Sequence, residues 1–293
     1  MKHPTNVAII GAGRLGTALA IALSKQNYVV SAVVSRTLKS AKRTARMLPT
    51  PATALDVTQL SSLTVPELLL ITTPDDQIKV VAQALESLPL AKRKKPVALH
   101  TSGALSSTVL STLAKRGWEV GSLHPLLSIS DLKGEVGFAG AYWCIEGQPL
   151  ARQRAKALVR SLKGNSFSIG LKYKALYHAS AVMSSGSVIA LFDAAIEMLT
   201  ACGLPRGEAK EVLMPLLEST VRSLDDKEPA AALTGPFARG DFETIKLHLD
   251  ALRSVHKREI EALYRSLGKR SLELAQVRGL DTRKVKKIRR IIR

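Results

Sequence analysis

The feature that most constrains the fold is a glycine-rich stretch near the start of the chain, Gly11-Ala12-Gly13-Arg14-Leu15-Gly16. An apolar run of strand length precedes this stretch, and an apolar pattern with a helical period follows it. In that setting the first glycine permits a tight turn, the second lets the backbone approach a pyrophosphate, and the third lets helix and strand pack closely. The stretch therefore predicts the first strand–turn–helix unit of a dinucleotide-binding domain, with Arg14 and Leu15 opening the helix that receives the phosphates. A plain structural turn is the alternative.

The end of the next predicted strand, residues 28–35, indicates which dinucleotide binds. An NAD site places a carboxylate about twenty residues after the glycines, where it binds the ribose hydroxyls. Here the strand ends in Ser35 and Arg36, and Lys39 follows closely. A guanidinium and a hydroxyl suit a 2′-phosphate, which a carboxylate would repel. The sequence favours NADP over NAD, unless Arg36 only faces solvent.

Later predicted strands also end in polar residues. Because ligands bind at the carboxyl ends of parallel strands, we expect Thr73 and Pro74 to flank the ribose of the cofactor. One of the two aspartates that follow, Asp75 or Asp76, is equally consistent with a helix cap and with a ligand contact. The next strand ends carry hydroxyl, glycine and imidazole groups: Thr101, Ser102, Gly103 and His124. These groups predict the floor of a substrate site, although a structural role fits each histidine equally well.

Strand signals stop near residue 170, and helical periodicity continues from there to the end of the chain. With 293 residues, of which 46% are hydrophobic, the chain is long enough for two domains with cores of their own. We therefore expect an α/β fold in which residues 1–170 form a Rossmann-type domain with a mainly parallel sheet that binds NADP. Residues 171–280 would form an all-α domain for substrate binding and dimerisation, and residues 281–293 a basic tail.

The net charge of +19 is concentrated in residues 92–95 and in the tail from Arg283 to Arg293. The first cluster precedes a strand and is predicted to be a solvated loop. In the tail, Val285, Ile288 and Ile292 share one helical face, which could dock on the protein, on nucleic acid or on an anionic surface. We favour a solvated or docked extension over a nucleic-acid arm, because no zinc finger, recognition helix or aromatic stacking motif accompanies the tail.

The two cysteines, Cys144 and Cys202, show no metal-ligand spacing, so we predict no metal site and expect a reducing, cytoplasmic environment. The first apolar run breaks at Gly11, which is too early for a signal peptide. We expect no membrane partner.

The longest apolar stretch, residues 179–199, carries Asp193 and Glu197 on one helical face. A buried helix explains this stretch better than a membrane span does. A helix that is apolar around most of its circumference must be buried in its own domain or against a partner, and we expect a homodimer through the helical domain.

Four further motifs, together with the glycine stretch, carry a family resemblance: His100–Ser106, Leu123–Leu126, Lys174–Ala179 and Leu233–Asp241. With them the chain resembles two-domain Rossmann-like oxidoreductases related to 6-phosphogluconate dehydrogenase, β-hydroxyacid dehydrogenases and pyrroline-5-carboxylate reductase. The resemblance covers residue 6 to about residue 277 and leaves out the basic tail. It implies a helical C-terminal domain of the 6-phosphogluconate dehydrogenase type and an NAD(P) cofactor, with the substrate usually unassigned.

The resemblance also implies candidate catalytic residues. The related β-hydroxyacid dehydrogenases use a serine-glycine loop, which Ser102-Gly103 matches, and a Lys-x-x-x-Asn pair, in which Lys174 matches the lysine and His178 replaces the asparagine. Residues four apart share a helix face, so the lysine could protonate a carbonyl oxygen as hydride arrives while the histidine holds that oxygen. The chain also has Ser185-Gly186 where related sequences carry an asparagine. A solvated helix-start residue is the alternative for Lys174.

A glycine-punctuated segment, Thr234 to Asp241, supplies the last candidates. Arg239 could clamp a substrate carboxylate, and Thr234 could hydrogen-bond to it. Alternatively, Asp241 caps the following helix and pairs with Arg239.

Taken together, the sequence predicts an NADP-dependent oxidoreductase. It would transfer hydride between nicotinamide and a small carbonyl, hydroxyacid or imine substrate bound between the domains. A non-catalytic NADP-binding module for redox sensing or regulation is the alternative, and a nucleic-acid role is a third.

Overall fold

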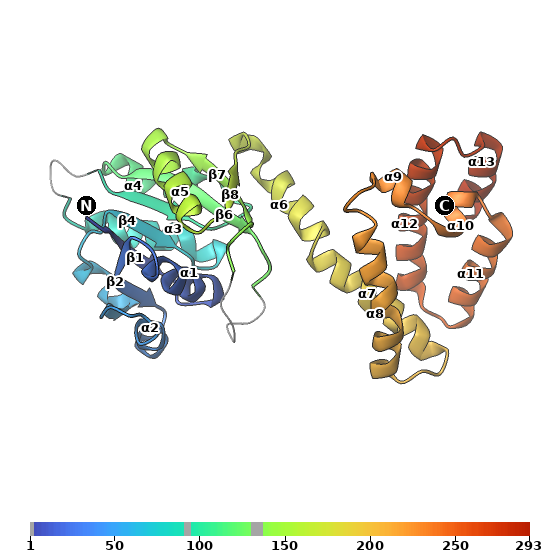
Figure 1. Ribbon diagram of the computed structural model, residues 1–293, viewed down its shortest axis with the longest axis horizontal. Coiled ribbons are helices and arrows are strands. Elements are labelled where there is room, and N and C mark those ends of the chain that lie inside the picture. Colours follow the sequence, from blue (N-terminus) through green and yellow to red (C-terminus); the bar gives the residue numbers. More distant parts are fainter. Residues whose placement is uncertain (1–2, 91–94, 130–136) are drawn as a thin grey trace. The chain divides into compact units, whose positions relative to one another are not determined.

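The computed structural model describes residues 3–90, 95–129 and 137–293, so most of the basic loop predicted at 92–95 lies outside the described residues. The chain divides into two compact units, a sheet unit of residues 1–185 and a helical unit of residues 186–293 (Figure 1). The division falls after α6 (Lys174–Met183), whereas the sequence places the boundary near residue 170.

The sheet unit contains one eight-stranded sheet in the order β3-β2-β1-β4-β5-β6-β7-β8. Its strands are β1 (Thr5–Ile10), β2 (Tyr28–Ser35), β3 (Thr53–Asp56), β4 (Leu68–Ile71), β5 (Val97–His100), β6 (Glu119–Leu126), β7 (Tyr142–Gly147) and β8 (Asn165–Phe167). Neighbouring strands are parallel except β6 and β7. The mainly parallel sheet is confirmed. The strand order reverses between β1 and β4, the place where open α/β sheets bind ligands beyond the carboxyl ends of their strands.

Helices cover both faces of this sheet (Figure 1). They are α1 (Arg14–Ser24), α2 (Leu38–Ala45), α3 (Asp75–Ala84), α4 (Ser111–Lys115) and α5 (Pro149–Ser161). Because successive strand residues point to opposite faces, Ile9 packs in one core with α1 and α5, and Ile10 packs in the other with α3 and α4. Both β1 residues are fully buried, so the glycine turn begins from a strand held on both sides.

The helical unit contains no strand among its residues, as the sequence predicted. Its helices are α7 (Gly186–Ala201), α8 (Arg206–Arg222), α9 (Pro229–Ala232), α10 (Gly235–Arg239), α11 (Phe242–Ser254), α12 (Arg258–Val277) and α13 (Thr282–Ile291). The basic tail is helix α13, and its apolar face packs in a small core with α11 and α12. Of the positions considered for the tail, the docked extension is the one observed.

The stretch from 171 to 201 is the one described helical segment with the length and hydropathy of a membrane span, and 6% of its most apolar window is buried. The expectation of a buried helix is therefore not met within this chain. The two acidic residues of this helix both have basic partners. Asp193 accepts a hydrogen bond from Arg206, and Glu197 lies 2.8 Å from the Lys257 ammonium.

Candidate cofactor and substrate site

Two glycines of the first turn are required by close packing. Gly11 has a φ of +115°, a region that favours glycine, and a Cβ there would lie 2.6 Å from the main-chain carbon of Thr72. A Cβ on Gly16 would lie 1.8 Å from the Gly11 carbonyl oxygen. The Thr72 hydroxyl, at the end of β4, donates a hydrogen bond to that same oxygen at 2.7 Å. The turn is therefore locked to the neighbouring strand.

Gly13 has a different environment. A Cβ on this exposed residue would meet no atom within 4 Å. Gly13 is the N-cap of α1, and among the described residues no side chain caps that helix or adds a carboxylate to its first turn. The N–H groups that open α1, at exposed Arg14 and half-buried Leu15, therefore have no capping side chain in the described part of the chain. This arrangement fits a bound pyrophosphate.

The end of β2 carries the predicted selectivity residues. Ser35 is half-buried, and Arg36 and Lys39 are exposed at the start of α2. Thr37 caps α2 by accepting a hydrogen bond from the Ser40 N–H at 3.3 Å. Among the described residues, no hydrogen bond or ion pair engages Arg36, so its guanidinium is available to an anion.

The ends of β4 and β5 hold a second group of predicted residues. Pro74 is the N-cap of α3, and the preceding Thr73 has a buried hydroxyl without a hydrogen-bond partner in the described part of the chain. A buried polar atom without a partner is uncommon and suits a ligand contact. Thr101 is buried, and its hydroxyl donates to the Ile71 carbonyl at 3.4 Å.

The Ser102 hydroxyl is fully engaged in building its loop. It donates to the Asp75 carboxylate at 2.8 Å and accepts from the N–H groups of Ala104 and Leu105 at 3.1 and 2.9 Å. Asp75 therefore ties the start of α3 to the loop after β5. The loop places the main-chain carbonyl of Ser102, rather than its hydroxyl, at the lysine of α6.

Lys174 is buried, with 2% of its surface exposed, which excludes the solvated alternative. Its ammonium donates to the Ser102 carbonyl at 3.2 Å and to the Ser122 hydroxyl at 2.8 Å. Burial lowers the pKa of this lysine, while nearby Cys144 and Glu146 oppose the shift. The first helical turn of α6 thus places a positive charge against the polar face of β6.

His124 and two residues of α6 form a cluster beside this charge. The His124 Nδ1 lies 2.7 Å from the Tyr177 hydroxyl, and its ring meets the His178 ring edge to face at a centroid distance of 5.6 Å. A Cβ on Gly103 would lie 2.4 Å from His178 Cδ2 and 2.8 Å from His124 Nε2. Only glycine allows both imidazoles to approach so closely. Burial, followed by the charge of Lys174, lowers the pKa of His124 to about 4, and burial raises the pKa of Tyr177.

These side chains form one wall of a cavity of about 630 Å³. Other parts of its lining are apolar, such as Leu126 and Phe167, or carry hydroxyl groups: Ser128, Ser180, Ser184 and Ser185. Lys174 does not line it, because its ammonium lies behind the Tyr177 ring, 5.7 Å from the ring centroid. The predicted Lys174–His178 pair is therefore split, and only the histidine reaches the cavity.

Sequence reasoning missed three residues of this site. Tyr177 belongs to the Lys174–Ala179 motif, and its position three residues after Lys174 on a helix could have identified it. Ser122 and Glu146 lie opposite each other on β6 and β7. A glutamate in an otherwise apolar strand is a signal, and Glu146 is buried with both carboxylate oxygens bonded to Ser107 at 2.7 Å.

The last predicted residues, Thr234 and Arg239, belong to the helical unit. Asp241 caps α11 by accepting from the Thr244 N–H at 3.3 Å, and Arg239 lies 3.9 Å from the Asp241 carboxylate. The capping alternative is therefore the observed local structure. Both Thr234 and Arg239 are exposed, and their contact with a substrate stays a prediction.

Two family models match the sequence. A Rossmann-like domain matches residues 2–125, and a domain of unknown function, DUF2520, matches residues 141–271. No curated protein matches the sequence.

Solved structures share this architecture. A "putative NADP oxidoreductase" from Bacteroides fragilis is 25% identical, with a TM-score of 0.74, and the match covers 92% of this chain and 99% of that chain. The 1-pyrroline-5-carboxylate reductase of Streptococcus pyogenes is 17% identical, with a TM-score of 0.61 and coverages of 94% and 100%. A reductive aminase from Aspergillus terreus in complex with NADPH is 17% identical, with a TM-score of 0.59 and coverages of 98% and 92%.

Proposed function

We propose that this chain, which has the architecture of a two-domain Rossmann-like oxidoreductase family, is an NADP-dependent reductase of a small carbonyl or imine compound, or a dehydrogenase of the matching hydroxyacid. One observation carries the proposal. The sheet unit combines an open glycine cradle at α1 with a cavity that imidazole and phenol groups line. The Bacteroides fragilis protein, described as a "putative NADP oxidoreductase", supports the same class of reaction.

The residues present fit a dinucleotide. Gly13 and the opening of α1 would hold the pyrophosphate, and Thr73 would offer its unpartnered hydroxyl to the ribose. When bound, the reduced nicotinamide supplies a hydride to the substrate carbon. The protein must then hold the substrate oxygen or nitrogen and deliver one proton to that atom.

His178 and Tyr177 are the groups best placed for that task, because both line the cavity and both carry polar hydrogens. The neighbouring His124 accepts from or donates to the Tyr177 hydroxyl and so fixes its position. We propose that Lys174 acts without touching the substrate, from its position behind the Tyr177 ring. Its ammonium orients the Ser102 loop and supplies a positive charge that stabilises negative charge developing on the substrate oxygen.

We expect Arg36→Ala to change the choice of cofactor. The exposed guanidinium is proposed to pair with the 2′-phosphate, so its removal should weaken NADPH binding by about tenfold and leave NADH binding unchanged. Titrations monitored by nicotinamide fluorescence measure both affinities. Lys79→Ala, at an exposed position of α3, serves as a control for general charge loss. Tighter binding of NADH than of NADPH by the unaltered protein would contradict the NADP assignment.

One observation favours a non-catalytic NADP-binding module as a second candidate: the Lys174 ammonium is absent from the cavity wall. Such a module would bind NADPH and transfer no hydride to any compound.

We also propose a cytoplasmic location, because both cysteines, Cys144 and Cys202, are free thiols.

The helical unit is proposed to form a homodimer. Large apolar side chains on α7 and α8 are exposed, among them Ile189 at 72% and Leu216 at 63%. Exposed apolar surface of this kind marks a protein interface, and a second copy would give α7 the burial that this chain does not supply. Light scattering should report a dimer that becomes monomeric in Ile189→Asp/Leu216→Asp. An unchanged dimer in that variant would place the interface elsewhere.

A further inference from the structure

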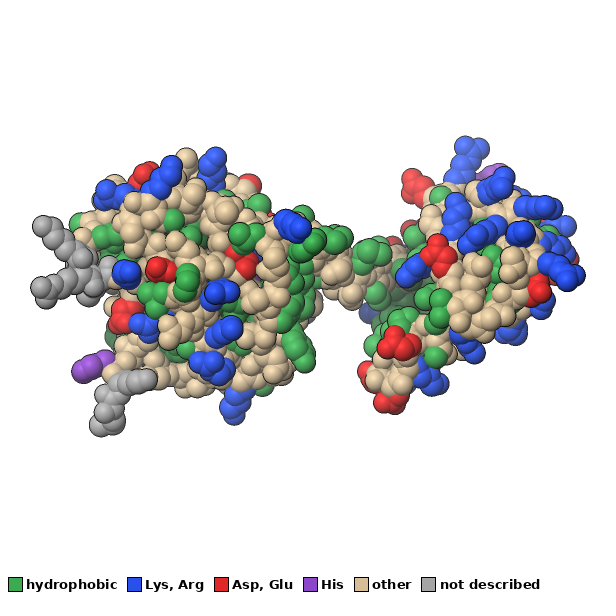
Figure 2. All heavy atoms as spheres, turned by 90° about the horizontal axis from the view of Figure 1, so that it is seen from above, with side chains coloured by type: hydrophobic (Ala, Val, Ile, Leu, Met, Phe, Trp, Pro, Cys, Tyr) green, Lys and Arg blue, Asp and Glu red, His purple; other side chains and the backbone are tan. Residues whose placement is uncertain are grey.

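The last helix, α13, carries a charged face that an oxidoreductase does not require. From Arg283 to Arg293 the sequence contains seven lysine and arginine residues and no aspartate or glutamate. All seven are exposed. Figure 2 shows lysine and arginine side chains gathered over the helical unit, where acidic side chains are fewer.

This helix is folded and fixed at its start. Val285, Ile288 and Ile292 are buried at 1%, 0% and 0% exposure in the core with α11 and α12. Asp281 caps the helix by accepting hydrogen bonds from the N–H groups of Arg283 and Lys284 at 2.7 and 3.2 Å. Because the apolar side of α13 is used for packing, every exposed residue of the helix after Thr282 is a lysine or an arginine.

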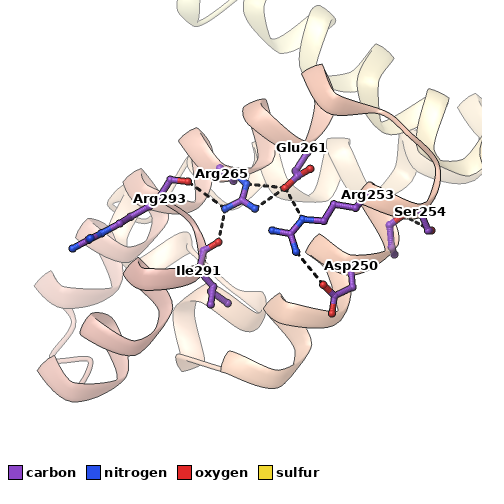
Figure 3. A network of polar contacts seen from close by, with 8 residues as sticks. Asp250, Arg253, Ser254, Glu261, Arg265, Ile291 and Arg293 are labelled. Atoms are coloured by element: carbon purple, nitrogen blue, oxygen red, sulfur yellow. Dashed lines mark hydrogen bonds and ion pairs between the residues drawn. The ribbon is translucent and has the colours of Figure 1, made fainter.

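The end of α13 is fixed by a network centred on Arg265 of α12 (Figure 3). The Arg265 guanidinium donates to the main-chain oxygens of Ile291 and Arg293, the latter at 3.3 Å. Glu261 holds the same guanidinium at 2.9 Å and is itself bonded to Arg253 at 3.2 Å. The end of α13 is therefore hydrogen-bonded to α12, and its cations project from a helix that is held at both ends.

Within the described residues, few carboxylates neutralise this face. Only Lys287 lies within ion-pair distance of one, with Glu243 at 3.7 Å, and Arg289 donates to the amide oxygen of Gln276. Arg283, Lys286 and Arg290 have no acidic partner there. Their spacing of three and four residues places them along one side of the helix, about 5–6 Å apart.

We propose that this face of α13 binds the phosphate backbone of a double-stranded nucleic acid without reading its sequence. A row of cations at this spacing complements the closely spaced charges of a duplex. The helix has no aromatic residue to stack on a base and no exposed large apolar residue to insert into a membrane. Both features favour phosphate contact as the mode of binding.

The test is fluorescence anisotropy of a labelled duplex DNA of mixed sequence, titrated with the full chain over a series of salt concentrations. We expect a dissociation constant on the order of 10⁻⁶ to 10⁻⁴ M near physiological salt, and weaker binding as salt rises. Arg283→Gln/Lys286→Gln/Arg290→Gln should reduce the magnitude of the salt slope by about 2 to 3, because three phosphate contacts are lost.

A matched control removes three exposed cations from the sheet unit, Lys79→Gln/Lys115→Gln/Arg116→Gln, so that both triple variants lose the same net charge. The control should keep the slope of the unaltered chain, and both variants should keep their helical circular dichroism and their NADPH affinity. The proposal is overturned by equal slopes in the α13 variant and the unaltered chain, or by equal losses in the two variants. Binding to phosphatidylserine vesicles without binding to the duplex would also overturn it, since the partner would then be a membrane surface.

Discussion

Replacing Gly16 with alanine is expected to lower the free energy of unfolding of the sheet unit by about 3 kcal/mol or more. The added Cβ would lie 1.8 Å from the Gly11 carbonyl oxygen and 2.5 Å from the Thr72 hydroxyl. Main-chain atoms held between β1 and β4 cannot move aside cheaply, so the turn itself must distort. Both tryptophans of the chain, Trp118 and Trp143, are buried in the sheet unit, so their fluorescence in a urea titration reports this unit alone.

Gly13→Ala is the matched control for this prediction. Its Cβ would meet no atom within 4 Å, so the unfolding free energy should change by less than about 1 kcal/mol. The methyl group would instead stand where the pyrophosphate approaches, and NADPH affinity should fall at least about tenfold. Equal stability of the two variants would show that the turn is not packed as described. Unchanged NADPH affinity in Gly13→Ala would show that the cofactor does not use this cradle.

Replacing Lys174 with methionine should lower turnover by about 10² or more, because a positive charge beside the cavity is lost. Stability should fall by about 1–3 kcal/mol, because the Ser102 carbonyl and the Ser122 hydroxyl would lose their buried donor. NADPH affinity should be unchanged. Lys172→Met, at an exposed site two residues earlier, is the control and should keep full turnover.

A spectroscopic measurement separates this role from a merely structural one. The charge of Lys174 is one cause of the low pKa of His124, which is about 4. In Lys174→Met the pKa of His124 should therefore rise towards its ordinary value, as an NMR titration of the imidazole would show. Full turnover in Lys174→Met, or an unmoved His124 titration, would remove Lys174 from the proposed role.

The sequence was sufficient for features that depend on local geometry. The glycine turn follows from residues within one strand–helix unit, and the placement of Lys174 and His178 on one helix follows from their spacing. The sequence could not place Ser122 and Glu146 beside the lysine, because their meeting depends on the register of β6 with the antiparallel β7. Strand register is set by the whole sheet and is not visible in one segment.

Other features were ambiguous for a physical reason. The apolar pattern of residues 179–199 shows that the helix needs burial, but it does not say whether the same chain or another provides it. The tail pattern of Val285, Ile288 and Ile292 likewise predicts an apolar face without naming its partner. In the structure that partner is the core of the helical unit. Arg239 illustrates the same limit, since a nearby carboxylate, Asp241, competes with any substrate for its guanidinium.

The most direct test of the proposed reaction is transfer of deuterium from NADPH deuterated at the reactive nicotinamide carbon. The protein would be incubated with a panel of 2-keto acids, semialdehydes and cyclic imines, and the products would be weighed by mass spectrometry. We expect one deuterium on the former carbonyl or imine carbon of at least one product, and about a hundredfold slower transfer in Lys174→Met. Tight NADPH binding with no deuterium in any product would contradict a reductase and support the non-catalytic module.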